Sequence, residues 1–350
     1  MWDSGAYTPP IGNSTGIALS SSINEAWEIL ANGGRIDIDH GLDLYQHASI
    51  NELGMLAHYV KRQKHGDNIH FNLNLHVNTT NICVLACRFC AFRKGSRHKD
   101  AYALSTHEYL ERVRPISDTI DEVHSVGGLH PEWTVEHYEE IYRAMKEEFP
   151  HISVKSLTAV EVKHISQRSG LSIRRTLERL RDAGLDALPG GGAEILVDSV
   201  RDRICRGKES SQEYLTIHRT AHEIGIPTNC TMLFGTVETL QDRITHLDRL
   251  RSLQDDTSGF QCFVPYPFLP DKTRLPEAKI PKGLEVIRTI AISRIMLDNI
   301  PHVKAYRMNI GDKLASIGIL SGADDIDGTV QREEIMHSAG SSTPLNTGMQ

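Results

Sequence analysis

The stretch NTTNICVLACRFCAFRKG, Asn78–Gly95, places three of the six cysteines of the chain, Cys83, Cys87 and Cys90, within eight residues. It directly follows FNLNLHVN (71–78), where apolar and polar residues alternate with the period of a β-strand. In a barrel of parallel strands, the loops that follow the strands lie at the catalytic face. The position of these cysteines therefore favours a chemical role over a place in the core.

Further short apolar runs continue the pattern along the chain. They cover 121–128, 152–159, 185–190, 227–235, 259–265, 303–309 and 323–328. Most are followed by amphipathic helical segments such as TVEHYEEIYRAMKEEF (134–149). Eight strands with helical crossovers, in a length of about 250 residues, predict an α/β fold of the (β/α)₈ TIM-barrel type. A doubly wound open sheet is the alternative, because counting strands does not prove that the sheet closes.

The predicted barrel is flanked by segments of different character. Residues 21–70 contain apolar positions at helical spacing, with serine before and glycine after the helical runs, and we expect a helical N-terminal extension there. Residues 1–20 and 338–350 are rich in Gly, Ser, Thr and Pro without periodicity, and we expect flexible tails. The barrel is then expected to span 71–337.

Composition narrows the class of protein. Hydrophobic residues make up 39% of the chain and charged residues 24%, as in ordinary globular proteins, and the net charge of −7 gives no reason to expect nucleic acid as a partner. The start of the sequence lacks the basic and then apolar run of a secretory signal, and there is no apolar stretch of about 20 residues for a membrane span. We expect a cytoplasmic protein that acts on a small molecule and keeps its thiols reduced.

Three clustered thiols in a reducing compartment indicate a metal site. A structural zinc ion needs four ligands, and here the fourth would have to come from a histidine such as His76 or His98. A cubane iron–sulfur cluster held by three thiolates instead leaves one iron open to a small-molecule ligand. The remaining cysteines are isolated in the sequence: Cys205, Cys230 and Cys262.

CVLACRFC resembles the C-x₃-C-x₂-C signature of the radical S-adenosylmethionine (SAM) enzymes, including the aromatic Phe89 before the last cysteine. The resemblance implies a [4Fe-4S] cluster, bound by Cys83, Cys87 and Cys90, whose open iron chelates the amino and carboxylate groups of SAM. It also implies a reducing electron donor of the flavodoxin or ferredoxin type. The reduced cluster would cleave SAM to methionine and a 5′-deoxyadenosyl radical.

Two glycine-rich stretches supply candidate SAM contacts. VGGLHP (126–131) follows the second predicted strand, and its glycine pair permits either a close approach to a ligand or a tight turn. The resemblance implies that Gly127 and Gly128 contact the methionine end of SAM. In LPGGGAEI (188–195), the Glu194 carboxylate could accept hydrogen bonds from the ribose hydroxyls. The alternative for Glu194 is an acidic residue at a helix N-terminus.

A narrower resemblance covers residues from about 35 to 338, through HVNTTNICVLACRFCAFRK, HSVGGLHPEW, GLDALPGGGAEIL and GADDIDGTV. These stretches are similar to the aminofutalosine synthase family of the futalosine route to menaquinone. That family adds the 5′-deoxyadenosyl radical to the enolpyruvyl double bond of 3-[(1-carboxyvinyl)oxy]benzoate, and rearrangement with loss of a carboxylate gives 6-amino-6-deoxyfutalosine. SAM would be a consumed co-substrate. The sibling families are the dehypoxanthine futalosine cyclases and the deazaflavin-forming synthase subunits.

A substrate with two carboxylates needs cationic partners, and a guanidinium suits a carboxylate best. Arg307, at the end of the seventh predicted strand, is our leading candidate. His130 could donate to the substrate or move a proton, although a loop histidine without such a role is the alternative. Three further candidates lie in or just after the eighth predicted strand, where Asp-Gly is also an ordinary turn: Asp325, Asp327 and Thr329.

Two other classes of function stay open at the level of the sequence. One is a non-catalytic module that binds zinc or a cluster. The other is a barrel lyase or aldolase that forms a Schiff base on a lysine such as Lys155 or Lys304. Only an iron–sulfur protein would be brown. Only the Schiff-base enzyme would have a carbonyl substrate trapped on its lysine by borohydride.

Overall fold

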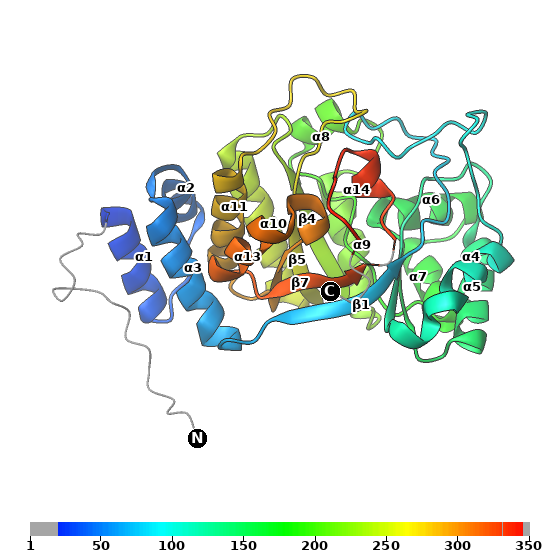
Figure 1. The fold of residues 1–350 in the computed structure, drawn as a ribbon, viewed down its shortest axis with the longest axis horizontal. Helices are drawn as coiled ribbons and strands as arrows, with labels where there is room; N and C mark the ends of the chain where they lie inside the picture. The colour runs from blue at the N-terminus through cyan, green and yellow to red at the C-terminus, as the bar shows by residue number, and fades with distance from the viewer. Residues whose placement is uncertain (1–19, 331, 346–350) are drawn as a thin grey trace.

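The computed structural model describes residues 20–330 and 332–345. Within these residues, seven parallel strands form one curled sheet in the order β3-β2-β1-β7-β6-β5-β4 (Figure 1). The strands are β1 (His70–His76), β2 (Glu122–Ser125), β3 (Ser153–Ser156), β4 (Thr228–Phe234), β5 (Phe260–Pro267), β6 (His302–Ala305) and β7 (Asp325–Val330). The order follows the chain around a ring, as in a TIM-type barrel, whereas a doubly wound sheet reverses direction at its centre. The barrel prediction is confirmed in this form.

The predicted strand at 185–190 is reduced to a pair of bridges between the two edges of the sheet. Ala187 forms an isolated parallel bridge with Lys155 of β3, and Leu188 forms one with Thr228 of β4. The strand stops there because Pro189 has no N–H to donate and Gly190 has a φ of +82°, outside the β region. The segment therefore joins β3 to β4 without forming a strand of its own.

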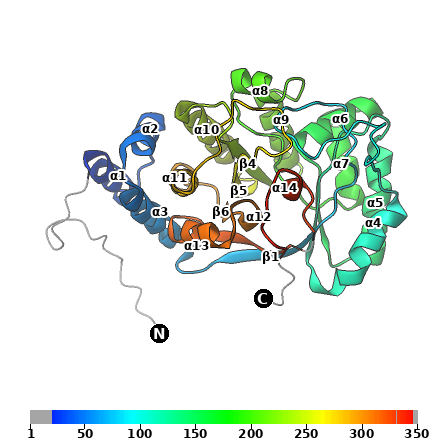
Figure 2. The same ribbon diagram turned by 45° about the horizontal axis from the view of Figure 1, so that its top comes forward.

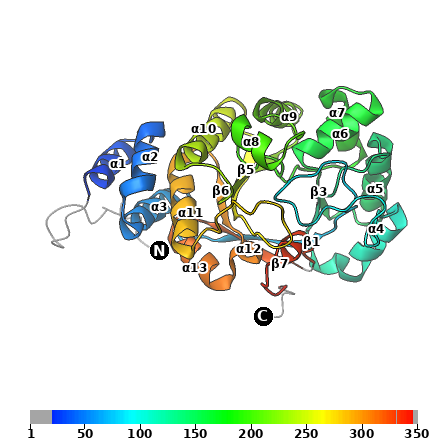
Figure 3. The same ribbon diagram turned by 90° about the horizontal axis from the view of Figure 1, so that it is seen from above.

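Helices cover the outside of the curled sheet (Figure 3). They are α4 (Thr106–Val113), α5 (Val135–Glu148), α6 (Ala159–Ser169), α7 (Ile173–Ala183), α9 (Ser211–Glu223), α10 (Leu240–Thr257), α11 (Gly283–Met296) and α13 (Asp312–Leu320). Capping boxes begin four of them, as in α6, where Thr158 and Glu161 exchange side-chain and backbone hydrogen bonds. The apolar faces of these helices and the strands share one continuous core.

Three helices precede the barrel and lie beside α11 and α13 (Figures 1 and 2). They are α1 (Ser21–Ala31), α2 (Ile38–His47) and α3 (Ile50–His65). Helix α3 buries Leu53, Leu56 and Ala57, and packs along α11. Helix α2 lies within the helical extension expected over 21–70, and the Asp37 side chain caps its start.

The region after β6 differs from the sequence expectation. The seventh predicted strand, 303–309, ends at Ala305, and Arg307–Ile310 forms the short helix α12. The Asp327 carboxylate accepts hydrogen bonds from the backbone N–H groups of Arg307 and Met308, which favours a helical turn there over a longer strand.

The two ends of the chain were expected to be flexible. Residues 1–19 and 346–350 lie outside the described residues, and α14 (Ile335–Ser338) precedes a described segment, 339–345. In that segment the Ser341 hydroxyl donates to the Met308 carbonyl, and the Pro344 carbonyl accepts from Arg307. Among the described helices, none has the length and apolarity required to cross a bilayer.

Candidate active site

A cavity of about 680 Å³ runs inside the barrel and opens beside the cysteine loop. Most of the candidate residues line it: Cys83, Cys87, Phe89, Cys90, Gly127, Glu194, Asp325 and Asp327. Gly128, His130 and Arg307 are not part of its described lining. For Thr329 the structure gives only the backbone, which pairs with Leu73 in the sheet.

The cysteine loop is held over the barrel mouth by the loop that follows β2. Gly128 N–H donates to the Thr80 carbonyl at 2.7 Å, and Val84 N–H donates to the Leu129 carbonyl at 3.1 Å. A Cβ atom at Gly128 would lie 2.2 Å from the Ile82 carbonyl oxygen. Non-bonded atoms do not approach this closely, so the two loops can meet only because residue 128 is glycine. The Gly127 N–H donates to the Glu161 carboxylate.

The three thiols are free of disulfide bonds and interact electrostatically with one another. Burial raises the pKa of Cys87 to about 12, and it also raises the pKa of Cys90. Backbone N–H groups of Arg93 and Phe92 act in the opposite direction on Cys90, because they stabilise its thiolate. A bound metal deprotonates such thiols. Three soft donors in one loop, with N–H groups directed at one sulfur, fit an iron–sulfur cluster.

The two histidines considered as a fourth zinc ligand are engaged elsewhere. His76 Nδ1 lies 2.8 Å from a Glu333 carboxylate oxygen, and the His98 side chain is 44% exposed beside Asp100. The geometry therefore favours three protein ligands at this site, and not the closed set of four that structural zinc requires.

Glu194 lies on the cavity wall, and its carboxylate forms an ion pair with Lys208. Its backbone φ of +45° is in the left-handed region, which is unusual for a residue with a side chain. Glu194 precedes helix α8 (Asp198–Ile204) and is not in its first turn, so the helix-terminus alternative does not describe it. The Lys208 ammonium lies 5.7 Å from the centre of the Phe89 ring, beside the cysteine loop.

Lys208 was missed by sequence reasoning. Burial alone would lower its pKa, but Glu194 and Glu209 raise the pKa, so the ammonium stays charged. Residues 195–207, including α8, separate Lys208 from Glu194. Because this spacing corresponds to no single element, nothing in the sequence distinguishes Lys208 from the other lysines.

His130 and Arg307 do not line the cavity, and their side chains have other partners. The His130 ring stacks on Trp133 with centroids 4.5 Å apart, and its Nδ1 accepts a hydrogen bond from the Glu132 N–H. The Arg307 guanidinium donates to the Asp312 carboxylate at 2.6 Å and to the Pro344 carbonyl at 2.8 Å.

The deep part of the cavity carries paired charges instead. Lys155 and Glu122 form an ion pair at 2.5 Å, and Lys304 and Asp325 form one at 2.9 Å. Glu122 was missed, and the signal for it is the alternation of polar residues along β2, which directs Glu122 and His124 to the same face. Burial alone would lower the pKa of Lys304, but Asp325 raises it. A charged lysine is a poor nucleophile, which disfavours a Schiff base.

Asp327 has a different environment from its neighbour Asp325. Burial raises the pKa of Asp327 to about 6, although the Arg307 N–H and Lys304 act to lower it. Asp325 has an ammonium partner in Lys304 and also accepts a hydrogen bond from the Cys262 thiol at 3.4 Å. The two carboxylates therefore carry different hydrogen-bond partners on the same wall of the cavity.

Comparison with protein families gives two matches along the chain. The model described as the radical SAM superfamily matches residues 77–250, and that of the CofH/MqnC C-terminal region matches residues 256–350. The first match contains the cysteine loop, the glycine pair, Glu194 and Lys208. The second contains β5, β6 and β7, with the cavity residues Asp325 and Asp327.

Individual proteins give a more specific relationship. The aminodeoxyfutalosine synthase of Thermus thermophilus is 42% identical over 325 residues, covering 91% of this chain and 87% of that protein. The cyclic dehypoxanthine futalosine synthase of Streptomyces coelicolor is 36% identical over 323 residues, covering 90% and 80%. The crystal structure of methylornithine synthase (PylB) superimposes with a TM-score of 0.72 at 16% identity, over 93% of this chain and 92% of that one, which supports the fold alone. The chain is therefore a radical SAM enzyme and belongs to the family that includes the aminodeoxyfutalosine and cyclic dehypoxanthine futalosine synthases.

Proposed function

We propose that this chain is an aminodeoxyfutalosine synthase that acts on 3-[(1-carboxyvinyl)oxy]benzoate in the cytoplasm. The observation that carries the proposal is the 42% identity to the Thermus thermophilus synthase over 91% of the chain, against 36% to the Streptomyces coelicolor cyclic dehypoxanthine futalosine synthase. The product is 6-amino-6-deoxyfutalosine. A reduced flavodoxin or ferredoxin is the proposed electron donor.

Cys83, Cys87 and Cys90 are the proposed ligands of a [4Fe-4S] cluster. Three thiols on one loop, all lining one cavity, support this assignment. When bound and reduced, the cluster supplies an electron that cleaves SAM to methionine and the 5′-deoxyadenosyl radical. The chain itself holds the loop in place, through the Gly128 contact and through Arg93, which donates to the Cys83 carbonyl.

SAM is proposed to lie between the cysteine loop and the Glu194–Lys208 pair. Gly127 lines the cavity next to the cysteines, and Gly128 allows its loop to approach them. The Glu194 carboxylate would accept hydrogen bonds from the ribose, while Lys208 holds that carboxylate in place and favours a nearby carboxylate of SAM. Phe89 forms part of the same wall.

The enolpyruvyl benzoate is proposed to occupy the deep part of the cavity. Two carboxylates need cations there, and the described lining supplies the Lys155 and Lys304 ammonium groups. This assignment replaces Arg307, whose guanidinium binds Asp312. Asp325 is proposed to orient Lys304, and Asp327 to fix the turn after β6. The barrel wall would exclude water from the reacting olefin.

The decisive experiment follows the 5′ carbon of SAM. Anaerobically reconstituted protein is incubated with 5′-¹³C-labelled SAM, a chemical reductant and 3-[(1-carboxyvinyl)oxy]benzoate, and the products are analysed by mass spectrometry. We expect the label in an adenosyl–benzoate adduct that has lost one substrate carboxylate, with methionine formed in proportion to the adduct.

A parallel reaction uses dehypoxanthine futalosine as the substrate. A cyclase would abstract hydrogen from this compound and release all the label as 5′-deoxyadenosine. That result, together with no adduct from the enolpyruvyl benzoate, would overturn the synthase assignment while leaving the radical SAM assignment intact.

A further inference from the structure

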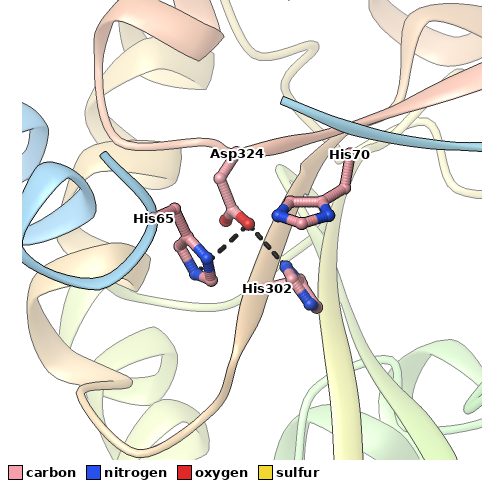
Figure 4. Close-up of side chains that lie close together, drawn as sticks. All are labelled: His65, His70, His302 and Asp324. Carbon is pink, nitrogen blue, oxygen red and sulfur yellow. Dashed lines mark hydrogen bonds and ion pairs between the residues drawn. The ribbon is translucent and has the colours of Figure 1, made fainter. Parts of the chain in front are cut away.

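Four side chains of kinds that bind metals in other proteins lie close together (Figure 4). They are His65 at the end of α3, His70 at the start of β1, His302 at the start of β6, and Asp324 immediately before β7. Their nitrogen and oxygen ligand atoms all lie within 4.8 Å of one another. The starts of parallel strands form one rim of a barrel, and the cysteine loop follows the other rim.

Both oxygens of the buried Asp324 carboxylate have partners. Its Oδ1 accepts hydrogen bonds from the Arg294 guanidinium and, at 2.9 Å, from the Val303 N–H. Its Oδ2 faces the histidines, 2.6 Å from His302 Nδ1 and 3.4 Å from His65 Nε2. A carboxylate whose second oxygen is fixed by such donors is a well-prepared metal ligand.

The three imidazole rings are arranged around this oxygen (Figure 4). The His65 and His302 rings are stacked with centroids 4.9 Å apart, and the His70 and His302 rings lie 4.4 Å apart. His70 is exposed, so its ring has room to turn. Bonds of about 2.0–2.2 Å place the ligands of a tetrahedral zinc ion roughly 3.4 Å from one another. His302 Nδ1 and Asp324 Oδ2, now hydrogen-bonded at 2.6 Å, would therefore move apart, while the wider pairs would move inward.

We propose that His65, His70, His302 and Asp324 bind one zinc ion as a structural site. Three imidazole nitrogens and one carboxylate oxygen form a closed tetrahedral set that suits Zn²⁺. The ion would replace the hydrogen bond between His65 Nε2 and the Pro301 carbonyl. It would join the end of α3 to the starts of three strands, and so fasten the N-terminal helices to the barrel.

The charges around the site set its affinity. His65 ends α3, and the partial negative charge at a helix C-terminus favours a cation. Arg294 and Lys61 both interact electrostatically with Asp324, and they repel a dication. The zinc ion is therefore held mainly by neutral nitrogen donors, with the carboxylate charge shared with Arg294.

The test measures metal content in the iron-loaded enzyme. Protein reconstituted with iron and sulfide is treated with a chelating resin to remove loosely bound metal, incubated with one equivalent of Zn²⁺ and desalted. Its iron and zinc contents are then measured by inductively coupled plasma mass spectrometry. We expect one zinc per chain in addition to the cluster iron. We expect zinc affinity to fall more than about 100-fold in each of three variants: His65→Ala, His70→Ala and His302→Ala. Substitutions of residues that only support a metal ligand typically cost less than this. All three variants should retain the cluster iron.

Controls separate this site from other thiols and histidines. His47→Ala removes an exposed histidine that also contacts an aspartate, and it should retain zinc. The triple Cys83, Cys87 and Cys90→Ala variant should lose iron and retain zinc. Because His70 is exposed, its substitution keeps the test valid if the other variants fold poorly. Wild-type protein without bound zinc, zinc retained by His70→Ala, or zinc lost with the cysteines would overturn the proposal.

Discussion

Cys83, Cys87 and Cys90 have no substitute within the cysteine loop, so each is predicted to be essential. Replacing any of them by alanine leaves two thiolates for the cluster, and we expect both the brown colour and the SAM cleavage to be lost. Visible absorption, iron content and methionine formation measure this. Cys205→Ser is the matched control: Cys205 is buried nearby but does not line the cavity, so the protein should stay coloured and active. Substantial activity in one of the three alanine variants would contradict the ligand assignment.

Glu194 is predicted to bind SAM through its carboxylate. In Glu194→Gln the side chain keeps its shape but loses its charge, so we expect SAM affinity to fall by roughly 1 to 3 kcal/mol, the cost of losing a charged hydrogen-bond partner. Calorimetry on the cluster-loaded protein gives the value. Glu277→Gln serves as the control, since Glu277 pairs with Arg88 of the cysteine loop outside the cavity. Equal affinities for the wild type and Glu194→Gln would remove Glu194 from the SAM site.

Single residues also show where sequence reasoning ends. The cysteines could be recognised as a group from the sequence because their spacing is short and lies within one loop. Arg307 was chosen because it follows a strand, but its backbone had already entered α12, and its guanidinium is directed to Asp312. Lys208 reaches the cavity only through the fold of 195–207, which no local pattern encodes. Side-chain direction depends on where an element ends, and ends are the least predictable part of an element.

The contact between the cysteine loop and the loop after β2 leads to a prediction about glycine. In Gly128→Ala the new Cβ would lie 2.2 Å from the Ile82 carbonyl oxygen and 3.1 Å from Cys83 Cβ, so the cysteine loop must shift. We expect reduced iron incorporation and reduced SAM cleavage. Gly95→Ala, in the same loop but with no atom within 4 Å of the added Cβ, should behave like the wild type. Iron content after reconstitution compares the two.

The buried Lys155–Glu122 ion pair joins strands β2 and β3. We predict that it makes the stability of the fold depend on pH. Burial would raise the pKa of Glu122, but Lys155 and His124 lower it from 4.5 to about 2. The folded pKa is thus below the unfolded value, so the pair stabilises the fold above pH 4.5 and loses this effect as the pH falls towards 2. In Lys155→Met the carboxylate is buried without its ammonium partner, which costs about 3–5 kcal/mol at pH 7.

That cost should shrink on acidification, because the pKa of the unpaired Glu122 rises and its protonated form is neutral. Urea unfolding of Lys155→Met and of wild type at pH 7 and pH 5 measures the difference. Lys146→Met removes the partner of Asp186 in a more exposed pair and should cost at most about 1 kcal/mol at either pH. An equal loss at both pH values in Lys155→Met would contradict the buried-charge explanation.

The elements themselves were predicted well where their pattern was long. Helix α5 follows from periodicity, and helices α7 and α10 follow from periodicity together with a serine or threonine cap. The run at 185–190 looks like a strand in sequence, yet Pro189 and Gly190 reduce it to two bridges. Closure of the barrel could not be predicted, because it depends on the pairing of Ala187 and Leu188 with strands far away in the sequence.

At the scale of the whole molecule, the N-terminal helices and the barrel share one core. Leu56 of α3 is fully buried and belongs to the same apolar cluster as Ile290 of α11. Arg251 of α10 donates to the Ile36 carbonyl, and Arg288 of α11 donates to the Ala48 carbonyl. Backbone carbonyls in the connections between α1, α2 and α3 therefore obtain hydrogen bonds from helices of the barrel. A buried interface of this kind couples the unfolding of the two parts.

We therefore predict that damage to α3 destabilises the cluster site at the far side of the molecule. Leu56→Ala should lower the free energy of unfolding by roughly 2–5 kcal/mol, as for other buried leucines. Far-UV circular dichroism and the visible absorbance of the cluster should then lose signal at the same urea concentration, below that of the wild type. Met55→Ala, on the same helix but 45% exposed, should change stability by about 0.5 kcal/mol or less. An early loss of helical signal with an unchanged cluster transition would mean that the N-terminal helices unfold as a separate unit.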